Sequence, residues 1–421
     1  MIFFNMCGFI TFTNFYKRST HNADFLKLKN INKHRGPDSI KLTTLNNHNI
    51  LFRRLKIIDL SDKADQPFES KNPDIQMVFN GEIYNYLEIK KELKKFKINF
   101  NTNSDTEVIL KSYVKWGIDF VNKLRGMFSI VIFDNKQKKI LFFRDHFGQK
   151  PLFYSLHDKG LIISSEIKDI LFIKKKYELN RKIINKYLIR GWTDDTDETF
   201  FKNIHSLPAG SFGEYSKKEF KIKKYWKLEY KNNIYHKDEL REVFEKNIKL
   251  HLRSDVPLAF TLSSGMDSSS ILRTALKFNI KKYKAFSLKT NYDNETDETK
   301  IIKKFVNKYG LNHQFLRFDY NDYNNVLEDL IQYQDEPINH PSFVYQYLLR
   351  KEISKQGFKV LLTGEGGDEV FGGYTRMYIP YIIENFFKTG NQINKTIINN
   401  INKVSNGNQE KILKNSINIY E

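Results

Sequence analysis

The sequence Leu262-Ser263-Ser264-Gly265-Met266-Asp267-Ser268-Ser269 stands between an apolar run and a helical pattern. Residues 257–262 predict a buried strand, and residues 268–278 predict a helix. The small residues between them let the backbone curl around a phosphate, to which hydroxyls and the N–H groups of a helix N-terminus donate. No Gly-Lys-Ser/Thr follows, so the stretch is not a Walker A loop. We therefore expect a strand–loop–helix phosphate site of another kind.

The segments that follow repeat the same alternation of strand and helix. Strands are predicted at residues 284–288, 313–318 and 360–363, and a helix at residues 297–309. Repeated βα units imply a doubly wound parallel sheet, whose ligands bind at the carboxyl ends of the strands. From residue 382 to residue 421 the chain is rich in Asn and Lys, and its spaced Ile and Leu fit modest helices.

A Gly-rich segment, Thr363-Gly364-Glu365-Gly366-Gly367-Asp368-Glu369-Val370-Phe371-Gly372-Gly373-Tyr374, follows the last of these strands. Five of the 20 Gly residues of the chain fall between residues 364 and 373, which indicates a backbone shaped around a ligand. Acidic side chains do not bind phosphate directly, so we expect Mg²⁺ as the intermediary, held by Asp267 and Asp368. The alternative is a Gly-rich turn with solvated acids.

The first half of the chain alternates short β-rich runs with turns, which predicts a layered β-rich domain. Helices are expected at residues 84–95 and 106–117, the second capped by Ser104 or Asp105. A Lys-rich stretch that ends near Lys237 has the composition of a linker, and no internal repeat is visible. The predicted strands are residues 8–12, 50–58, 75–79, 127–133, 140–144, 152–155, 161–164 and 211–215.

Length and charge limit the class of protein. The 421 residues, at about 150 residues per domain, predict two or three domains. The formal charge is +20, from 69 Lys and Arg against 49 Asp and Glu, but only 14 of the 69 basic residues are Arg. Surfaces that read phosphate favour Arg for its bidentate geometry, and the basic runs here lack interleaved aromatic residues. We interpret the charge as a solvated surface and expect no nucleic-acid partner.

Cys7 is the only cysteine, so no disulfide can form within the chain and a reducing, cytoplasmic compartment is expected. No apolar run approaches the roughly 18 residues of a membrane span, so we expect no membrane partner.

A lone cysteine is usually a small buried hydrophobe. In Met6-Cys7-Gly8, however, initiation at Met6 and removal of that methionine would place Cys7 at the N-terminus. Its α-amine, with a pKa of about 8, would then take the thiol proton before attack on a carboxamide.

Five motifs in order resemble the N-terminal-nucleophile glutaminase domain of glutamine-dependent asparagine synthetases. They are Cys7-Gly8-Phe9-Ile10, His34-Arg35-Gly36-Pro37-Asp38, Arg54-Leu55-Lys56-Ile57-Ile58-Asp59, Asn80-Gly81-Glu82-Ile83-Tyr84-Asn85 and Arg144-Asp145-His146-Phe147-Gly148. Residues 262–269 resemble the Ser-Gly-Gly-x-Asp-Ser loop of ATP pyrophosphatases, with Ser264 where that family has Gly. The resemblance implies an α/β two-domain chain: an N-terminal-nucleophile αββα sandwich over residues 7–218, then a doubly wound parallel α/β ATP-pyrophosphatase domain over residues 235–421.

At the glutaminase site the resemblance implies that Cys7 is the nucleophile and that Asn80 and Gly81 form the oxyanion hole. The guanidinium of Arg54 suits bidentate binding of the glutamine α-carboxylate. The remaining implied glutamine contacts are the strand backbone of Leu55, Lys56, Ile57 and Ile58 and, for the α-ammonium, the carboxylates of Glu82 and Asp105.

Two residues of these motifs have alternative interpretations. A surface ion pair is the alternative for Arg54, because Arg53 is adjacent and only one of the two can face the pocket. His34 is expected to be structural, with a general base as its alternative.

At the second site the resemblance implies that Glu365 lies where the acyl-adenylate and ammonia meet and accepts a proton. Leu288 is implied as an adenine wall, and a core strand position is its alternative. Asp335-Glu336-Pro337 and His340-Pro341-Ser342 resemble the segment near the acceptor pocket. The implied ATP contacts are Leu262, Ser263, Ser264, Gly265, Asp267, Ser268, Leu288, Thr363 and Gly364.

The activity implied is conversion of aspartate, glutamine and ATP to asparagine, glutamate, AMP and pyrophosphate, with ATP and Mg²⁺ as cofactors. The expected partners are therefore small molecules, and a homodimer is compatible with the resemblance. One alternative aminates another carboxylate, on a sugar or a secondary metabolite. Another is a truncated glutaminase-only or inactive remnant, because the catalytic lysine and the Arg-x-Pro-Phe-Leu-Asp string of the family are not found here. On this interpretation the second domain is incomplete.

Overall fold

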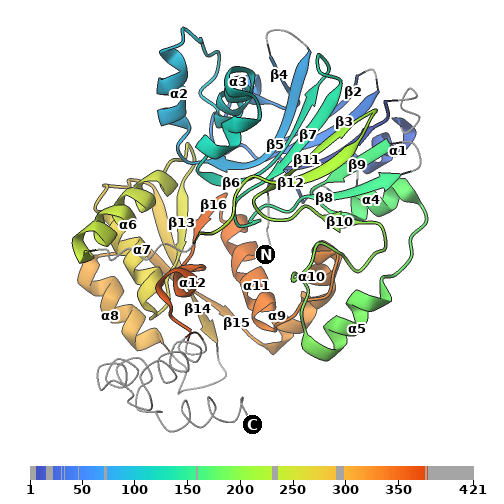
Figure 1. Cartoon of the computed structure of the whole chain (residues 1–421). Helices are drawn as coiled ribbons and strands as arrows, with labels where there is room; N and C mark the ends of the chain where they lie inside the picture. The colour runs from blue at the N-terminus through green and yellow to red at the C-terminus, as the bar shows by residue number, and fades with distance from the viewer. Residues whose placement is uncertain are drawn as a thin grey trace, which may run out of the picture.

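The computed structural model describes residues 6–15, 22–29, 31–32, 34–45, 47–70, 74–157, 160–229, 236–290, 298–374 and 377. These residues form two domains that pack against each other (Figure 1). The helices expected between residues 382 and 421 lie outside the described residues, as do residues 1–5 ahead of Met6.

The first domain is built on two antiparallel sheets of six strands each. The first sheet contains, in spatial order, β10 (His205–Ser206), β8 (Phe153–His157), β9 (Gly160–Ser164), β1 (Gly8–Thr13), β3 (His48–Arg54) and β2 (Ser39–Leu45). The second contains β12 (Phe220–Lys224), β11 (Ser211–Ser216), β7 (Lys139–Arg144), β6 (Gly126–Asp134), β5 (Ile75–Ile83) and β4 (Phe68–Glu69). The helical segments of this domain are α1 (Asn22–Leu28), η1 (Asp62–Ala64), α2 (Tyr86–Lys94), α3 (Asp105–Trp116), η2 (Gly117–Lys123), α4 (Ile167–Lys174) and α5 (Arg181–Arg190).

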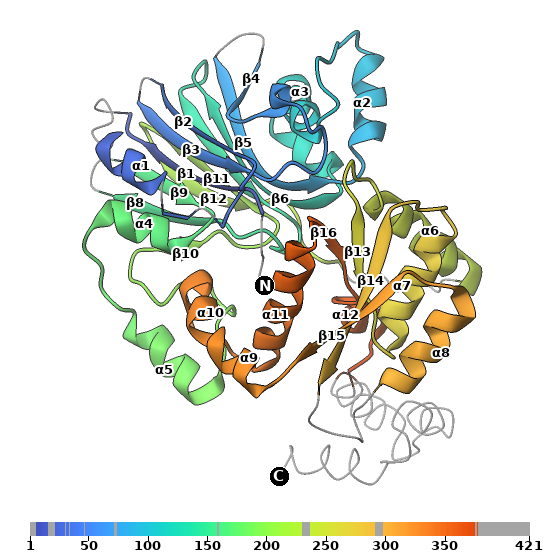
Figure 2. The same cartoon turned by 180° about the vertical axis from the view of Figure 1, so that it is seen from behind.

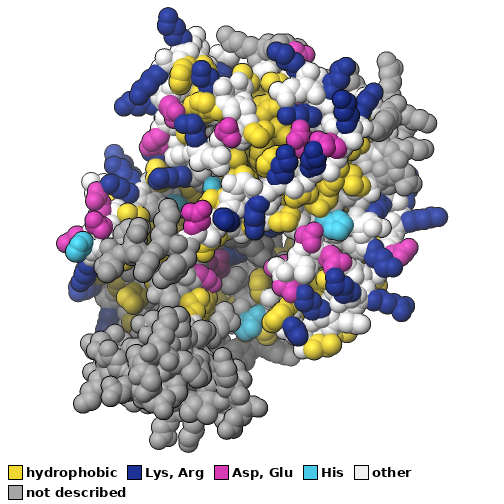
Figure 3. Space-filling model, in the orientation of Figure 1, with side chains coloured by type: hydrophobic (Ala, Val, Ile, Leu, Met, Phe, Trp, Pro, Cys, Tyr) yellow, Lys and Arg dark blue, Asp and Glu magenta, His cyan; other side chains and the backbone are white. Residues whose placement is uncertain are grey.

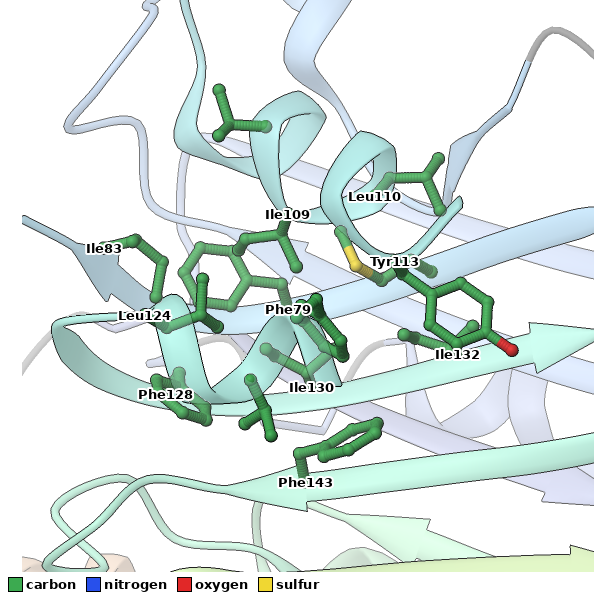
Figure 4. Packing of buried hydrophobic residues seen from close by; sticks show 14 of the residues in the cluster. Phe79, Ile83, Ile109, Leu110, Tyr113, Leu124, Phe128, Ile130, Ile132 and Phe143 are labelled. Carbon is green, nitrogen blue, oxygen red and sulfur yellow. The ribbon is translucent and has the colours of Figure 1, made fainter. Parts of the chain in front are cut away.

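Side chains that alternate along the strands stack these sheets face to face. On β6, Val131 packs into the cluster between the two sheets, whereas Ile130 and Ile132 pack with α2 and α3 on the outer side. Figure 4 shows this outer cluster around Phe79, Phe128 and Phe143. On the other sheet, the outer faces of β1, β3 and β9 pack against α1 and α4. The order helix, sheet, sheet, helix confirms the predicted αββα sandwich.

The second domain is a parallel sheet in the order β15 (His313–Phe318), β14 (Tyr283–Thr290), β13 (Leu258–Thr261) and β16 (Val360–Leu362). One face packs against α6 (Lys237–His251), α7 (Met266–Leu276) and α8 (Thr299–Tyr309), and the other against α11 (Ser342–Lys355). The remaining helices are α9 (Tyr320–Asn325), α10 (Leu327–Gln334) and α12 (Gly367–Phe371). Helices on both faces confirm the doubly wound fold. The strand order reverses between β13 and β16, which makes this pair the switch point of the sheet.

Two local predictions are wrong. The strand expected over residues 50–58 ends at Arg54, and residues 55–58 form a loop. The stretch expected to be a linker contains β12, which pairs with β11 over its whole length. β12 is the edge strand of its sheet, where Lys side chains project into solvent, and this explains its linker-like composition.

The interface between the domains is formed partly by α10 and α11, which lie between the parallel sheet and helices α4 and α5 of the first domain (Figure 2). On the face drawn in Figure 3, Lys and Arg side chains are spread among Asp and Glu. Within the described residues, no helix has the length and apolar character needed to span a membrane.

Candidate functional site

The thiol of Cys7 lies directly ahead of β1, and its side chain packs against the cluster between the two sheets. The Leu55 N–H donates to the sulfur at 3.2 Å, and the sulfur lies 3.6 Å from the Leu55 carbonyl oxygen. Burial raises the pKa of the thiol to about 11, although the hydrogen bond from Leu55 and the charges of Arg54 and Lys150 oppose this rise. With Met6 still attached, the thiol is therefore protonated at neutral pH.

Arg53 and Arg54 point to opposite faces of β3, as strand alternation requires. Arg53 enters the outer layer, where it donates to the Leu28 carbonyl at 2.6 Å and lies 3.6 Å from Asp169. Arg54 faces the gap between the sheets and is 4% exposed, so the ion pair that it forms with Asp65 lies largely below the surface rather than on it.

The guanidinium of Arg54 organises the loop that follows it. It donates to the carbonyls of Asp59 and Ser61, the latter at 2.8 Å, and to the Asp65 carboxylate at 2.7 Å. The loop of residues 55–59 thus runs past Cys7 with its backbone exposed to the sulfur, although it is not a strand. Contact between Arg54 and a glutamine α-carboxylate remains a prediction.

Asn80 and Gly81 occupy β5 at the same gap. Asn80 is 1% exposed, and its Nδ2 has no hydrogen-bond partner among the described residues. A buried, unpaired amide N–H is costly and calls for a functional explanation, such as a ligand oxygen. A side chain at Gly81 would place its Cβ 2.0 Å from the Met127 carbonyl oxygen, so β5 and β6 approach closely only because this residue is Gly. The Nδ2 group of Asn80 is therefore suited to donate a hydrogen bond to an oxyanion that forms during a reaction.

Two buried carboxylates complete this site. Burial raises the pKa of Glu82 to about 7, and Asp105 adds to the rise. Burial likewise raises the pKa of Asp105 to about 6, although the Ile83 N–H donates to its carboxylate at 3.1 Å. Carboxylates in such surroundings gain from a cationic partner, as an α-ammonium would provide.

Lys150 is the site residue that sequence reasoning missed. It is 4% exposed, and its Nζ lies 2.9 Å from the sulfur of Met6, the residue before Cys7. Burial lowers the pKa of Lys150 to about 8, while the charge of Glu82 opposes the shift. One Lys among many carries no signal in the sequence, and only the fold reveals that this one is buried.

His34 has the expected structural role. Its Nε2 lies 2.6 Å from the Glu166 carboxylate, which also accepts from Arg35 at 2.5 Å. The ring packs on Tyr333 of α10, with ring centroids 4.7 Å apart. His34 therefore joins the two domains rather than facing the thiol.

The second site is formed where β13 and β16 end, at the switch point of the parallel sheet. The Ser263 N–H donates to the Ser268 hydroxyl at 3.0 Å, and the Gly265 N–H donates to the Ser263 hydroxyl at 3.1 Å. The Ser264 N–H donates to the Glu298 carboxylate at 2.8 Å. The loop therefore presents an N–H group that already binds an anionic oxygen.

The Gly-rich segment closes on this loop. A Cβ built on Gly367 would lie 2.4 Å from the Asp267 carboxylate, and one on Gly364 would lie 3.0 Å from the Ser268 nitrogen. The two motifs, about a hundred residues apart in sequence, therefore lie in direct contact. Thr363 and Gly364 begin the Gly-rich segment and lie where it meets the loop of residues 263–268.

Carboxylates gather beside the two loops. Partial burial raises the pKa of Asp267, and the charges of Asp368 and Glu369 add to the rise. The described residues contain no group of three His, Cys, Asp or Glu arranged to hold a metal ion. Mg²⁺, however, is usually held by one or two carboxylates together with substrate phosphates. Asp267 and Asp368 fit that mode of binding.

The remaining predicted residues of this site differ in exposure. The Glu365 carboxylate is exposed and accepts from Arg350 of α11 at 2.9 and 3.2 Å. Leu288 is partly exposed near the end of β14 and belongs to none of the core clusters among the described residues, which disfavours its core alternative. The Leu262 side chain lies in the core, so any contact it makes with a nucleotide runs through its backbone.

Comparison with known proteins gives two family matches. Residues 6–226 match the glutamine amidotransferase domain family, and residues 239–415 match the asparagine synthase family. A Methanocaldococcus jannaschii protein, named provisionally asparagine synthetase (glutamine-hydrolyzing) 2, is 34% identical over 397 residues, which cover 88% of this chain and 76% of that protein. Asparagine synthetase (glutamine-hydrolyzing) 1 of Bacillus subtilis is 30% identical over 93% of this chain and 63% of its own length.

Among solved structures, glutamine phosphoribosylpyrophosphate amidotransferase from B. subtilis matches with 11% identity and a TM-score of 0.38, covering 73% of this chain and 65% of that one.

Proposed function

Since the chain belongs to the family of glutamine-hydrolysing asparagine synthetases, a family of carbon–nitrogen ligases, we propose that it moves the amide nitrogen of glutamine onto a carboxylate activated by ATP. The observation that carries the proposal is that Asn80 Nδ2 is buried without a hydrogen-bond partner among the described residues, at the gap that holds the only cysteine. We assign glutamine hydrolysis to residues 7–218 and the ATP-dependent step to the domain that begins near residue 235. A reducing compartment such as the cytoplasm suits the free thiol.

The first step is nucleophilic attack by the Cys7 sulfur on the glutamine carboxamide. The thiol proton passes to the α-amine that Cys7 would carry once the residues before it are removed. Asn80 Nδ2 and the Gly81 N–H stabilise the oxyanion. Collapse of the tetrahedral adduct breaks the C–N bond, ammonia leaves with the proton, and a thioester remains. Water hydrolyses the thioester to glutamate and frees the thiol.

Glutamine is held for this step at both ends of its amino-acid group. Arg54 binds the α-carboxylate, and Glu82 with Asp105 binds the α-ammonium. The shifted pKa values of these two carboxylates support this assignment, since a bound ammonium favours their charged forms. The charge of Lys150 opposes the rise in the pKa of Glu82 and lowers the pKa of the Cys7 thiol, so it favours the charged forms of both groups.

The second step joins the acceptor carboxylate to the α-phosphorus of ATP and releases pyrophosphate. Residues 263–265 and the N-terminus of α7 bind the phosphates, and the backbone of Leu262, Thr363 and Gly364 with Leu288 contacts the adenosine. Asp267 and Asp368 would hold Mg²⁺, which when bound neutralises charge on the phosphates. Ammonia then attacks the acyl-adenylate, AMP leaves, and Glu365 accepts the proton from nitrogen. Arg350 supports this role because its guanidinium, 2.9 Å from the Glu365 carboxylate, holds that side chain in place.

Aspartate is the acceptor we propose, because the first two relatives described above are named asparagine synthetases. The test is a pair of assays on the purified chain. We expect ammonia release from glutamine, and AMP with asparagine when ATP, Mg²⁺ and aspartate are added. Cys7→Ala should abolish the first activity and retain AMP formation with free ammonia. Ammonia release without AMP would leave a glutaminase only, and AMP formation with another carboxylate in place of aspartate would identify a different acceptor.

A further inference from the structure

The glutamine loop, residues 55–59, ends in a residue with an unfavourable backbone. Asp59 has a φ of +55°, in the left-handed region that residues other than Gly rarely adopt. Such conformations persist where several contacts with neighbouring groups fix the backbone. Within the first domain, Asn103 N–H donates to the Asp59 carboxylate at 2.7 Å, and the Ser61 hydroxyl donates to it at 2.6 Å. Arg54 donates to the Asp59 carbonyl.

The second domain supplies two further bonds to the same loop, both from Asp255. The Asp255 carboxylate accepts from the Asp59 N–H at 2.8 Å, and the Asp255 N–H donates to the Ile57 carbonyl at 3.1 Å. Asp255 lies just before β13, the strand that leads into the loop of residues 263–265. A residue of the ATP-dependent domain therefore holds the backbone that runs past the thiol.

A second contact reaches the loop from the neighbouring strand. Lys359, just before β16, lies 2.7 and 2.9 Å from the two carboxylate oxygens of Asp38. Asp38 in turn accepts from the Lys56 N–H at 2.7 Å. The amino ends of both switch-point strands thus fix the glutamine loop, while the carboxyl ends of the same strands form the predicted nucleotide site.

We propose that Asp255 is a positioning residue for glutamine: the second domain completes the glutamine site by fixing residues 57–59. This inference rests on the function proposed above. Asp255 does not touch the substrate, so it acts through the loop on binding rather than on the chemistry of Cys7. Its side chain is solvent-exposed, which limits the effect of its loss to several-fold.

The test compares Asp255→Ala with Glu88→Ala. Glu88 forms a paired contact with Arg253 across the same domain interface, at 2.6 and 2.5 Å, but outside the loop. We expect Asp255→Ala to raise KM for glutamine about fivefold to tenfold, with kcat within twofold and ammonia-dependent AMP formation unchanged. Asp255→Asn, whose amide oxygen still accepts from the Asp59 N–H, should restore KM. Glu88→Ala should leave KM unchanged.

Amide hydrogen exchange gives a readout that needs no substrate. Exchange in the peptide of residues 55–61 should be faster in Asp255→Ala and unchanged in Glu88→Ala. An unchanged KM and unchanged exchange in Asp255→Ala, or an equal rise in KM for Glu88→Ala, would overturn this inference alone. Wild-type protein without glutaminase activity would overturn the proposed function and the inference with it.

Discussion

The two candidate sites of this chain differ in how far their polar groups are buried in the absence of a ligand. Around Cys7 the polar groups are buried and held, and Asn80, Arg54, Glu82 and Asp105 are all nearly inaccessible to solvent. At the switch point of the parallel sheet, by contrast, Ser263, Ser264 and Glu365 are exposed. The free-energy cost of removing these polar groups from water arises when the chain folds and not during the reaction. The first site is therefore preorganised for charge development. The polar groups of the second site remain open to solvent, and we expect the proposed nucleotide to cover them.

Electrostatics follow the same division. At the first site, burial shifts the pKa values of Cys7, Glu82, Asp105 and Lys150 far from their usual ranges. At the second, partial burial raises the pKa of Asp267, and the charges of Asp368 and Glu369 add to this rise. Perturbed pKa values cluster where a protein has arranged charge in advance. Four predictions test whether this contrast is real.

The largest effect is expected at Asn80. Asn80→Ala removes the unpaired donor and should lower kcat for glutamine hydrolysis about 10²–10³-fold. Ser129→Ala is the matched control, because Ser129 pairs with Asn80 across β5 and β6 and its hydroxyl is likewise buried and unpaired within the described residues. Steady-state ammonia release measures both. Equal losses in the two variants would show that packing in the gap, not oxyanion stabilisation, is responsible.

Asp267→Asn should reduce AMP formation at least about 100-fold, since it removes a carboxylate assigned to Mg²⁺. The thermal stability of the variant, in contrast, should not decrease. A carboxylate whose folded pKa is raised destabilises the folded state once the pH exceeds its ordinary value. The variant should therefore be as stable as wild type at pH 3 and at least as stable at pH 7. A loss of stability at pH 7 would assign Asp267 to the architecture of the loop instead.

The thiol provides a third comparison, between chains that retain residues 1–6 and chains that begin at Cys7. In the longer form, a thiol pKa of about 11 predicts alkylation at pH 8 that is about tenfold to hundredfold slower than for an ordinary cysteine, and a rate still rising at pH 10. Mass spectrometry of the alkylated protein measures this. Glutamine hydrolysis by the longer form at the rate of the shorter one would exclude the α-amine as the base.

The smallest effect is expected at Ser264, where related loops carry Gly. Its side chain is exposed, and its N–H already binds the Glu298 carboxylate, so the Cβ does not block an anion. Ser264→Gly should change KM for ATP by less than about threefold, a difference below 1 kcal/mol. A tenfold decrease in KM would show that the side chain obstructs the phosphates and that the open site is less adapted to ATP than proposed.

Much of the fold follows from local sequence pattern. Residues 140–144 and 313–318, predicted as strands, agree with β7 and β15 within one residue, because these short segments rich in aromatic and branched apolar residues are bounded by turns. Ser104 caps α3 as predicted, accepting from the Thr106 N–H. The strand predicted over residues 55–58 is wrong because its apolar residues continue the pattern of β3, whereas Arg54 draws the following carbonyls into a loop.

Residues of the candidate sites could be predicted where they belong to sequence motifs. They could not be predicted where their role depends on burial in the folded chain. Cys7, Asn80 and the loop at Asp267 stand out as residue types at particular spacings. Lys150 does not, because Lys is common throughout the chain and only its position beneath Met6 distinguishes it. The choice between Arg53 and Arg54 needed the register of β3, and the contact of Asp255 with Asp59 spans 196 residues, which no local pattern encodes.

In the proposed reaction, one nitrogen passes from the enclosed site to the open one. Glutamine labelled with ¹⁵N in its amide, supplied with ATP, Mg²⁺, aspartate and unlabelled ammonium, tests it directly by mass spectrometry of the products. We predict AMP together with asparagine whose amide carries the label. Labelled free ammonia with no labelled asparagine would contradict the account.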